Sequence, residues 1–400
     1  MTAGYGTPMQ LGGIRNQVGY CAAGRRVSAW RPGSGITDRG TIPCPGRGLD
    51  RLRFRVLNAG RTKRLLGPLV GAYTTTNVWP VGAEGLVATV GRRAFVSSDG
   101  GRSWSVTREL PASSGPMGVL PTSLCEHDGE LYLAEYPLGD EDARVLASDD
   151  DGRSWSPYHV QEDARHFHGL FHDPYGGRLW ATTGDTDRES AVGYFDDGRF
   201  RPVGSGSQRW RAVGLAFTPD AVLWGMDCPY VDTVELLALP RDRIGAAEPE
   251  PETVGTTTES VYYVETLSVG GESVVVAATA AECGTDSTAP TAERADSGSR
   301  TARVLAATSA TGYREWRELC SFTRRSSVGE SLSALPAASA YVFVRANDEL
   351  GLVINPYNTS RHHGEILQVP PSDLERLLFD DDPEAVPTVG GPGRSERTHD

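Results

Sequence analysis

Two histidines and an aspartate in the stretch RHFHGLFHDPYGGRLWATTGD have the types and spacing of a divalent metal site. His166 and His168 are two residues apart, so on an extended strand both side chains lie on the same face. Asp185 ends the next apolar run and is expected beside them on the neighbouring strand. Imidazole nitrogens with a carboxylate oxygen are a plausible ligand set for a divalent ion. The alternative is that the histidines satisfy buried hydrogen bonds without a metal; no other cofactor is expected.

Further polar residues collect at the starts of predicted strands and at the ends of the strands that follow them. Neighbouring antiparallel strands bring these positions to one edge of a sheet. The residues suited to acid–base or nucleophilic chemistry are Glu135, Asp185, Asp227, Tyr262, Glu265 and Glu282. The residues suited to holding a polar or acidic ligand are Arg165, His166, His168, Trp210, Arg211, Arg345 and Asn347. The simpler alternative is that each is structural or merely solvated.

Six short apolar runs, each after a turn, predict the elements that position these residues. They begin at Gly85, Glu130, Arg178, Ala221, Ser273 and Ala340, and the first four are about 45 residues apart. Each unit can be divided into four strands, which in the second unit are SLCEHDG, LYLAEY, RVLASDD and SWSPYHV. Four-stranded units at this period are typical of a β-propeller. We therefore predict an all-β fold, a six-bladed β-propeller of four-stranded antiparallel blades.

The repeat also sets the expected domain boundaries. Residues 51–379 are predicted to form a single propeller, preceded by an N-terminal extension at 1–50 and followed by a disordered acidic tail at 380–400. The polar segments 246–260 and 283–301 are predicted to be flexible insertions. The last unit lacks an outermost strand after GEILQVP, and we hypothesise that RFRVLNAGRTKRLLG, before the first unit, supplies it.

The octapeptides SSDGGRSW and SDDDGRSW, at 97–104 and 148–155, share the pattern Ser-x-Asp-x-Gly-x-Ser-Trp, and FDDGRF and SATGYREW are degenerate copies. The pattern resembles the Asp box of the bacterial neuraminidase repeat family. The resemblance implies a hairpin between the third and fourth strands of a propeller blade. In such a turn the aspartate accepts amide hydrogen bonds, the glycine relieves a strained φ, and the tryptophan packs against the sheet. These residues are therefore expected to be structural, and a polar or acidic, glycan-like ligand is expected at the channel mouth on the opposite face.

The same resemblance implies an enzymatic alternative, a sialidase-like glycoside hydrolase or lyase that acts on acidic sugars. Such enzymes hold the substrate carboxylate with three arginines and use a tyrosine nucleophile with a glutamate partner. The arginines would be Arg55 (in FRVL, where Leu57 replaces the usual proline), Arg211 and Arg345. The nucleophile pair would be Tyr262 or Tyr263 with Glu265 or Glu135.

The sequence supports a second resemblance and also leaves open a function without catalysis. From about Asn77 to about Pro356 the chain is similar to haloarchaeal glycosyl-hydrolase-like Asp-box proteins, which share the features RHFHG, LWATTGD, LWGMD and SVYY. This similarity implies the same fold and no established activity. The alternative from a different class is a non-catalytic scaffold that binds a protein partner through its rim or through the 283–301 segment.

Composition narrows the choice of partner. The formal net charge is −13, from 52 acidic and 39 basic residues, and Lys63 is the only lysine. An acidic surface argues against nucleic acid as a partner and fits a salt-adapted organism. The six cysteines show no metal-type spacing, the N-terminus has no secretory pattern, and no apolar stretch reaches membrane-spanning length. We therefore expect a cytoplasmic protein whose partner is a small molecule, a glycan or a protein, and neither nucleic acid nor a membrane.

Overall fold

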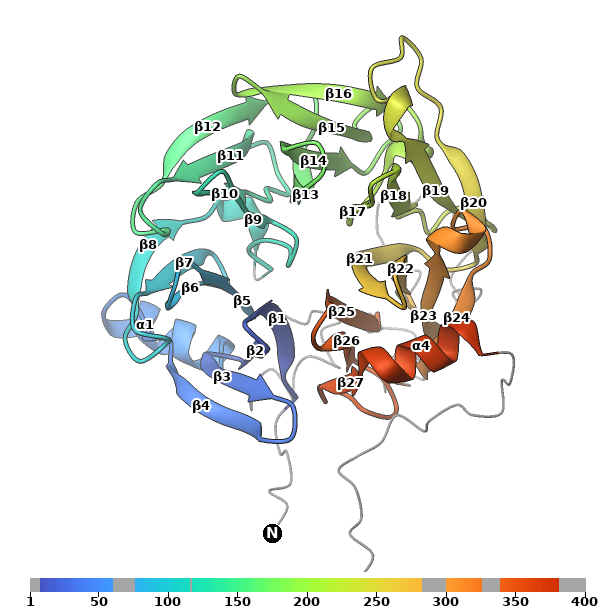
Figure 1. Ribbon diagram of the computed structural model, residues 1–400. Coiled ribbons are helices and arrows are strands. Elements are labelled where there is room, and N and C mark those ends of the chain that lie inside the picture. Colours follow the sequence, from blue (N-terminus) through green and yellow to red (C-terminus); the bar gives the residue numbers. More distant parts are fainter. Residues whose placement is uncertain (1–7, 60–75, 116, 283–299, 326–338, 381–400) are drawn as a thin grey trace, which may run out of the picture.

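The computed structural model describes residues 8–59, 76–115, 117–282, 300–325 and 339–380. Within these ranges the strands form seven antiparallel sheets arranged in a ring (Figure 1). Six sheets have four strands and the last in the chain has three. The protein is therefore an all-β, seven-bladed propeller, and the predicted count of six blades is wrong.

The strands follow the chain from the inner edge of each blade to its outer edge. In blade order they are β1 Gln10–Arg15, β2 Val18–Ala23, β3 Arg26–Arg31 and β4 Gly35–Thr41; β5 Thr76–Val81, β6 Gly85–Val90, β7 Arg93–Ser97 and β8 Ser105–Glu109; β9 Leu124–His127, β10 Glu130–Ala134, β11 Ala143–Ser148 and β12 Ser156–Gln161; β13 His166–Asp173, β14 Arg178–Gly184, β15 Ala191–Asp196 and β16 Arg199–Ser205; β17 Ala216–Phe217, β18 Ala221–Gly225, β19 Val234–Pro240 and β20 Glu252–Thr257; β21 Val261–Val269, β22 Glu272–Thr279, β23 Thr301–Thr308 and β24 Arg317–Thr323; β25 Tyr341–Asn347, β26 Gly351–Tyr357 and β27 Leu367–Val369.

The helices are short. Helix α1 spans Gly48–Leu57 and α4 spans Pro371–Phe379. Single 3-10 turns occupy Ala112–Ser114, Gln208–Trp210, Arg241–Arg243 and Ser309–Thr311. None of the described helices is long and apolar enough to cross a membrane.

The blade that the six-blade prediction missed is formed by β1–β4, within residues 1–50 that were expected to be an extension. Its second strand, VGYCAA, is buried at every position but lacks the valine and leucine run of the other second strands. The first and fourth strands of this blade, QLGGIR and GITDRGT, are rich in glycine and polar residues. Because the count relied on aliphatic runs, it passed over a blade whose core depends on small side chains and on aromatic residues.

Two further expectations about these segments are corrected. The segment 246–260 is not a loop throughout, because Glu252–Thr257 forms strand β20. Residues 53–57 of the proposed closing strand lie in α1, whose one buried residue, Phe54, packs with Val78 and Phe95 of the second blade. The remainder of the closing segment from residue 60, residues 283–299 and the tail from 381 lie outside the described residues.

A buried side chain of the seventh blade contributes to ring closure, beside a 3.1 Å hydrogen bond from the Met9 amide to the Gly364 carbonyl. Asn355 is buried on β26, and its Oδ1 accepts a 2.9 Å hydrogen bond from the amide of Leu11 on β1. Its Nδ2 donates to the carbonyls of Met9, at 3.1 Å, and Glu365, at 2.8 Å. One amide thereby satisfies backbone groups of both chain ends that would otherwise be left without partners.

The two octapeptides link the third and fourth strands of the second and third blades, where they were predicted. Ser97 Oγ accepts a 2.8 Å hydrogen bond from the Gly101 amide, and Asp99 Oδ1 accepts a 2.9 Å hydrogen bond from the Ser103 amide. The same two bonds, with the same lengths, occur around Asp150 in the second copy. The turns thus have the structural role expected of them.

The tryptophans of these hairpins pack against the preceding blade. Trp155 lies against a cluster that includes Val87 of the second blade, and its Nε1 donates a 3.3 Å hydrogen bond to Thr107. In the degenerate copy of the sixth blade, Trp316 donates to the Val254 carbonyl of the fifth blade at 3.1 Å. Each of these two tryptophans therefore ties its own blade to the blade before it.

Candidate functional site

A cavity of about 360 Å³ is lined by residues of the third to seventh blades, with Tyr136 and Leu138 from the third. Its polar lining comes from residues beside the starts of first strands and the ends of second strands, as predicted: Arg165, His168, Asp185, Arg211, Asp227, Tyr262 and Glu282. In an antiparallel blade these positions lie at the face opposite the hairpin between the third and fourth strands. The cavity is therefore a mouth of the channel, on the face away from the octapeptide turns.

Asp185, directly after β14, is the centre of a charged cluster in the mouth. It pairs with Arg165 and accepts a 3.2 Å hydrogen bond from His168 Nε2. His166 Nε2 and Arg211 Nη2 each lie 3.4 Å from one of its oxygens. Burial alone would raise the pKa of Asp185, but its interactions with the two histidines outweigh this effect and hold the pKa well below its usual range.

The potential ligand atoms of His166, His168 and Asp185 lie within 4.8 Å of one another, so the predicted trio does come together. Its surroundings, however, suit a cation poorly, because Arg165 and Arg211 already contact the same carboxylate and would repel a divalent ion. Burial also lowers the pKa of His166, which favours a neutral ring. Its Nδ1 lies 3.2 Å from the Pro137 carbonyl, whereas its buried Nε2 has no hydrogen-bond partner among the described residues. The residues fit a network that positions Asp185 better than they fit a metal site.

Arg211, just before β17, links this cluster to the fifth blade. Its Nε and Nη2 lie 3.2 and 3.1 Å from Asp227 Oδ2, and its Nη1 donates a 3.0 Å hydrogen bond to the Asp185 carbonyl. Both side chains of the Arg211–Asp227 pair are almost fully buried. The second oxygen, Asp227 Oδ1, is also buried and has no hydrogen-bond partner among the described residues. Because Asp227 lines the cavity, this oxygen is an acceptor that a ligand could use.

Glu282, shortly after β22, provides the titratable group of the mouth. Its two oxygens accept hydrogen bonds from the hydroxyls of Ser260, at 2.6 Å, and Tyr262, at 2.8 Å. Burial and the nearby charge of Asp227 raise the pKa of Glu282 to about 7, against the opposing effect of these two hydrogen bonds. A carboxyl group with this pKa can give or take a proton at neutral pH.

An aromatic wall, formed by Tyr262, Tyr263, Tyr341 and Phe343, lines the side of the cavity that belongs to the sixth and seventh blades. The rings of Tyr262 and Tyr341 meet edge to face at 5.2 Å, and those of Tyr263 and Phe343 are also 5.2 Å apart. Tyr341 and Phe343 were not predicted. Their run was taken as a second strand, but β25 is the first strand of its blade, so the start of the run faces the mouth.

The assignment of this run as a second strand also explains why two residues that were predicted at the mouth lie elsewhere. Because β25 is a first strand, Arg345 and Asn347 lie at its far end, away from the mouth. Arg345 pairs with Glu265 at 2.9 Å in a separate cavity, which also contains Glu126. Asn347 Oδ1 accepts from the amides of a following turn. Neither Arg345 nor Glu265 can therefore join Arg211 or Tyr262 in one site.

Two other candidates have structural roles. Glu135 is buried and pairs with Arg108 of the second blade at 2.9 Å, and it does not line the mouth. Trp210 is buried in the core of the fifth blade, where its ring stacks on Trp224 at 5.4 Å. Arg55 is exposed on α1, next to the first two blades. The predicted three-arginine clamp is therefore not assembled.

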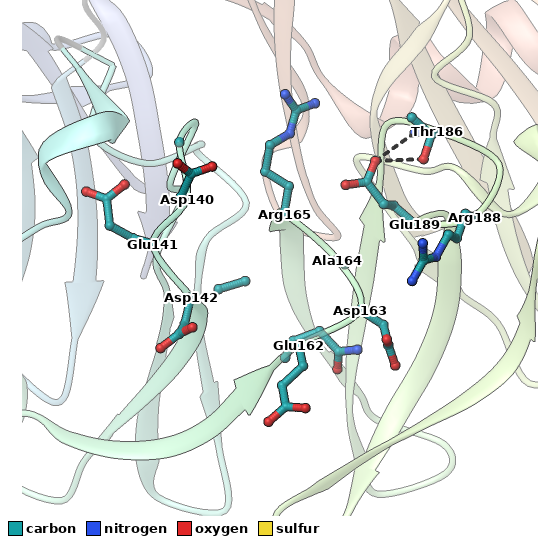
Figure 2. A pocket seen from close by; sticks show the side chains of 13 residues that line it. Asp140, Glu141, Asp142, Glu162, Asp163, Ala164, Arg165, Thr186, Arg188 and Glu189 are labelled. Atoms are coloured by element: carbon teal, nitrogen blue, oxygen red, sulfur yellow. Dashed lines mark hydrogen bonds between the residues drawn. The ribbon is translucent and has the colours of Figure 1, made fainter.

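A wider groove of about 600 Å³ adjoins the mouth, and Arg165 lines both. Figure 2 shows its side chains on three loops, with Asp140, Glu141 and Asp142 on one side and Glu189 on the other. Glu162 and Asp163 add two more carboxylates, opposed by Arg165 and Arg188. The groove gives the approach to the mouth a negative potential, which disfavours anions.

Comparison with known proteins supports the fold. YCF48 from Cyanidioschyzon merolae is 12% identical, with a TM-score of 0.52, over 92% of this chain and 98% of that chain. An ancestral GH74 enzyme is also 12% identical with a TM-score of 0.52, over 89% of this chain but only 44% of its own length. The chain is a β-propeller, and at this identity the likeness shows the fold alone. No protein-family model matches the sequence, and no curated protein matches it either.

Proposed function

We propose that the mouth binds a small, uncharged ring with several hydroxyl groups, such as one sugar unit of a glycan. The aromatic wall offers ring faces and edges against which a sugar can pack. Asp227 lines the same cavity from the fifth blade and offers its Oδ1 to a hydroxyl donor. One apolar side with a few polar groups is the usual composition of a small-molecule site.

The observation that carries this proposal is a buried hydrogen-bond acceptor in the mouth that has no protein partner. Asp227 Oδ1 is buried without a partner among the described residues, and Glu282 is held by two hydroxyls. Arg165 and Arg211 both pair with carboxylates, so the charge of each guanidinium is already balanced. The Nε of Arg165 is buried without a partner among the described residues. A hydroxyl group both donates and accepts, so a hydroxyl-rich ligand could supply the donor that Asp227 Oδ1 lacks and an acceptor for Arg165 Nε.

Titration with neutral and acidic monosaccharides, followed by ligand-observed NMR, tests the proposal. Tyr262→Phe keeps the ring but removes one hydroxyl, and Glu282→Gln removes the charge; both should weaken binding by about tenfold, the value of one or two hydrogen bonds. Glu126→Gln, in the separate cavity, is the matched control and should bind as the wild type does. Tighter binding of acidic than of neutral sugars, or no effect of either variant, would contradict the proposal.

One observation favours a hydrolase as a second candidate. Glu282 has a pKa of about 7 and lies near the Asp227 charge, so a protonated carboxyl and a carboxylate can coexist in the mouth, as glycoside hydrolysis requires. Release of nitrophenol from aryl glycosides, lost in Glu282→Gln and in Asp227→Asn, would support turnover. The resemblance of the octapeptides to Asp boxes supports a glycan-related role but selects neither candidate.

A further inference from the structure

Helix α1 carries an apolar face that the rest of the described protein leaves uncovered. Leu49, Leu52 and Val56 are 83, 55 and 48% exposed. Their spacing places them on one side of the helix. Phe54, the only buried residue of α1, lies on the opposite side, among the first two blades. Leu57, 51% exposed, is a further apolar residue beyond this row, and α1 itself lies at the edge of the ring (Figure 1).

Arginines border this apolar face on both sides. At 100° per residue, Arg53 and Arg55 lie on either side of the row formed by Leu49, Leu52 and Val56. Both arginines are exposed, as are Arg47 and Arg51, and within the described part of the chain none of the four forms an ion pair. Only Asp50 opposes them on the helix. This segment is basic in a chain whose net charge is −13.

We propose that α1 docks on an anionic lipid surface, with Leu49, Leu52 and Val56 among the acyl chains and Arg53 and Arg55 at the headgroups. An apolar row bordered by arginines is the arrangement of helices that lie in the plane of a membrane interface. The long arginine side chains allow their charges to remain at headgroup level while the helix is partly submerged. A helix that lies on the surface of a membrane needs no membrane-spanning segment. The absence of a long apolar stretch in the sequence therefore does not argue against this kind of binding.

The shape of the surface favours a lipid layer over a protein groove. Phe54 anchors one side of α1 to the propeller through contacts that include Phe95, so only the outward side of the helix is available. A groove that encloses a helix would have to displace this anchor, whereas a planar surface needs only the outward side. The charge of the arginines matches anionic headgroups, each contributing roughly a fivefold change in partition.

Flotation of the full chain with lipid vesicles tests the proposal. At low salt, the protein should float with vesicles of equal parts phosphatidylcholine and phosphatidylglycerol, and not with phosphatidylcholine alone. Leu49→Ser with Leu52→Ser should reduce partition by more than about tenfold, since two apolar side chains are lost. Arg53→Gln with Arg55→Gln should reduce it by roughly 25-fold and weaken its dependence on salt.

The control is Val160→Ser, which alters another exposed apolar residue, on β12, and should float as the wild type does. Because the substituted side chains are exposed, all variants should keep the wild-type unfolding temperature. A wild-type protein that stays with the soluble fraction, or equal flotation of the leucine variant, would overturn the proposal. Recovery of α1 in a stable complex with an acidic protein, without flotation, would also overturn it. None of these outcomes depends on sugar binding in the mouth.

Discussion

The Tyr262 hydroxyl donates a 2.8 Å hydrogen bond to Glu282 Oε1 across the first two strands of the sixth blade. Burial, together with the charge of Asp227, raises the pKa of this glutamate to about 7. The same burial raises the pKa of Tyr262 well above its ordinary value, so the tyrosine remains the proton donor of the pair. The protonation state of the mouth near neutral pH therefore depends on Glu282.

Replacement of Glu282 by glutamine should make stability less dependent on pH. The folded-state pKa of about 7 is above the ordinary value of 4.5, so between these values the folded protein holds a proton that the unfolded chain has lost. The free energy of unfolding therefore falls as pH rises through this window. Glutamine does not ionise, so the variant should unfold at a higher temperature than the wild type above about pH 7, with a smaller difference near pH 4.5. Melting curves that stay parallel across this range would contradict the assigned pKa.

Substitution of Arg211 by methionine should be strongly destabilising. It leaves Asp227, which is buried, without its charged partner, and the loss of one member of a buried pair costs about 3–5 kcal/mol. Urea denaturation measures the change. Asp227→Leu in the same chain should recover part of the loss, because the unpaired charge is then removed as well. The exposed pair of Arg314 and Glu252 provides the control, and Arg314→Gln should cost about 0–1 kcal/mol.

Asn355→Ala should weaken ring closure. The substitution leaves the Leu11 amide and the carbonyls of Met9 and Glu365 without their partner, at a cost of about 1–3 kcal/mol for each group that water does not reach. Hydrogen exchange should show faster exchange in β1 and β26 than in the middle blades. Asn347→Ala, at an exposed turn of the same blade, is the control and should affect only its own turn. Uniform protection around the ring would mean that Asn355 is not the closing contact.

The sequence predicts much of this molecule because its signals are local. A turn that needs Ser, Asp and Gly at fixed offsets determines its own conformation, and therefore the hairpins at Asp99 and Asp150 were placed correctly. Likewise, the end of a second strand and the start of a first strand must share an edge, so Asp185, Arg211 and Glu282 were correctly expected in one cavity.

The wrong predictions come from relations that a local pattern does not contain. The order of strands in the last blade decides which end of β25 faces the mouth, and one misassigned strand moved Arg345 to the wrong end and concealed Tyr341. The pairing of Arg108 with Glu135 depends on packing between the second and third blades, which the sequence does not specify. The first blade was missed for a different reason. The count looked for runs of aliphatic residues, and the core of this blade includes Tyr20 and Cys21.

The hairpin glycines provide a test of how tightly neighbouring blades pack. Gly152 has a φ of +84°, and a Cβ there would lie 2.7 Å from Val87 Cγ2 of the preceding blade. Gly177, in another hairpin, has a φ of +58°, and a Cβ there would have nothing within 4 Å. Gly177→Ala should therefore cost only the left-handed backbone penalty of about 1–2 kcal/mol. Gly152→Ala should cost this penalty plus about 1–3 kcal/mol for overpacking. Chemical denaturation measures the loss in the free energy of unfolding for each variant. Equal losses would show that the interface between the second and third blades accommodates an added methyl group without cost.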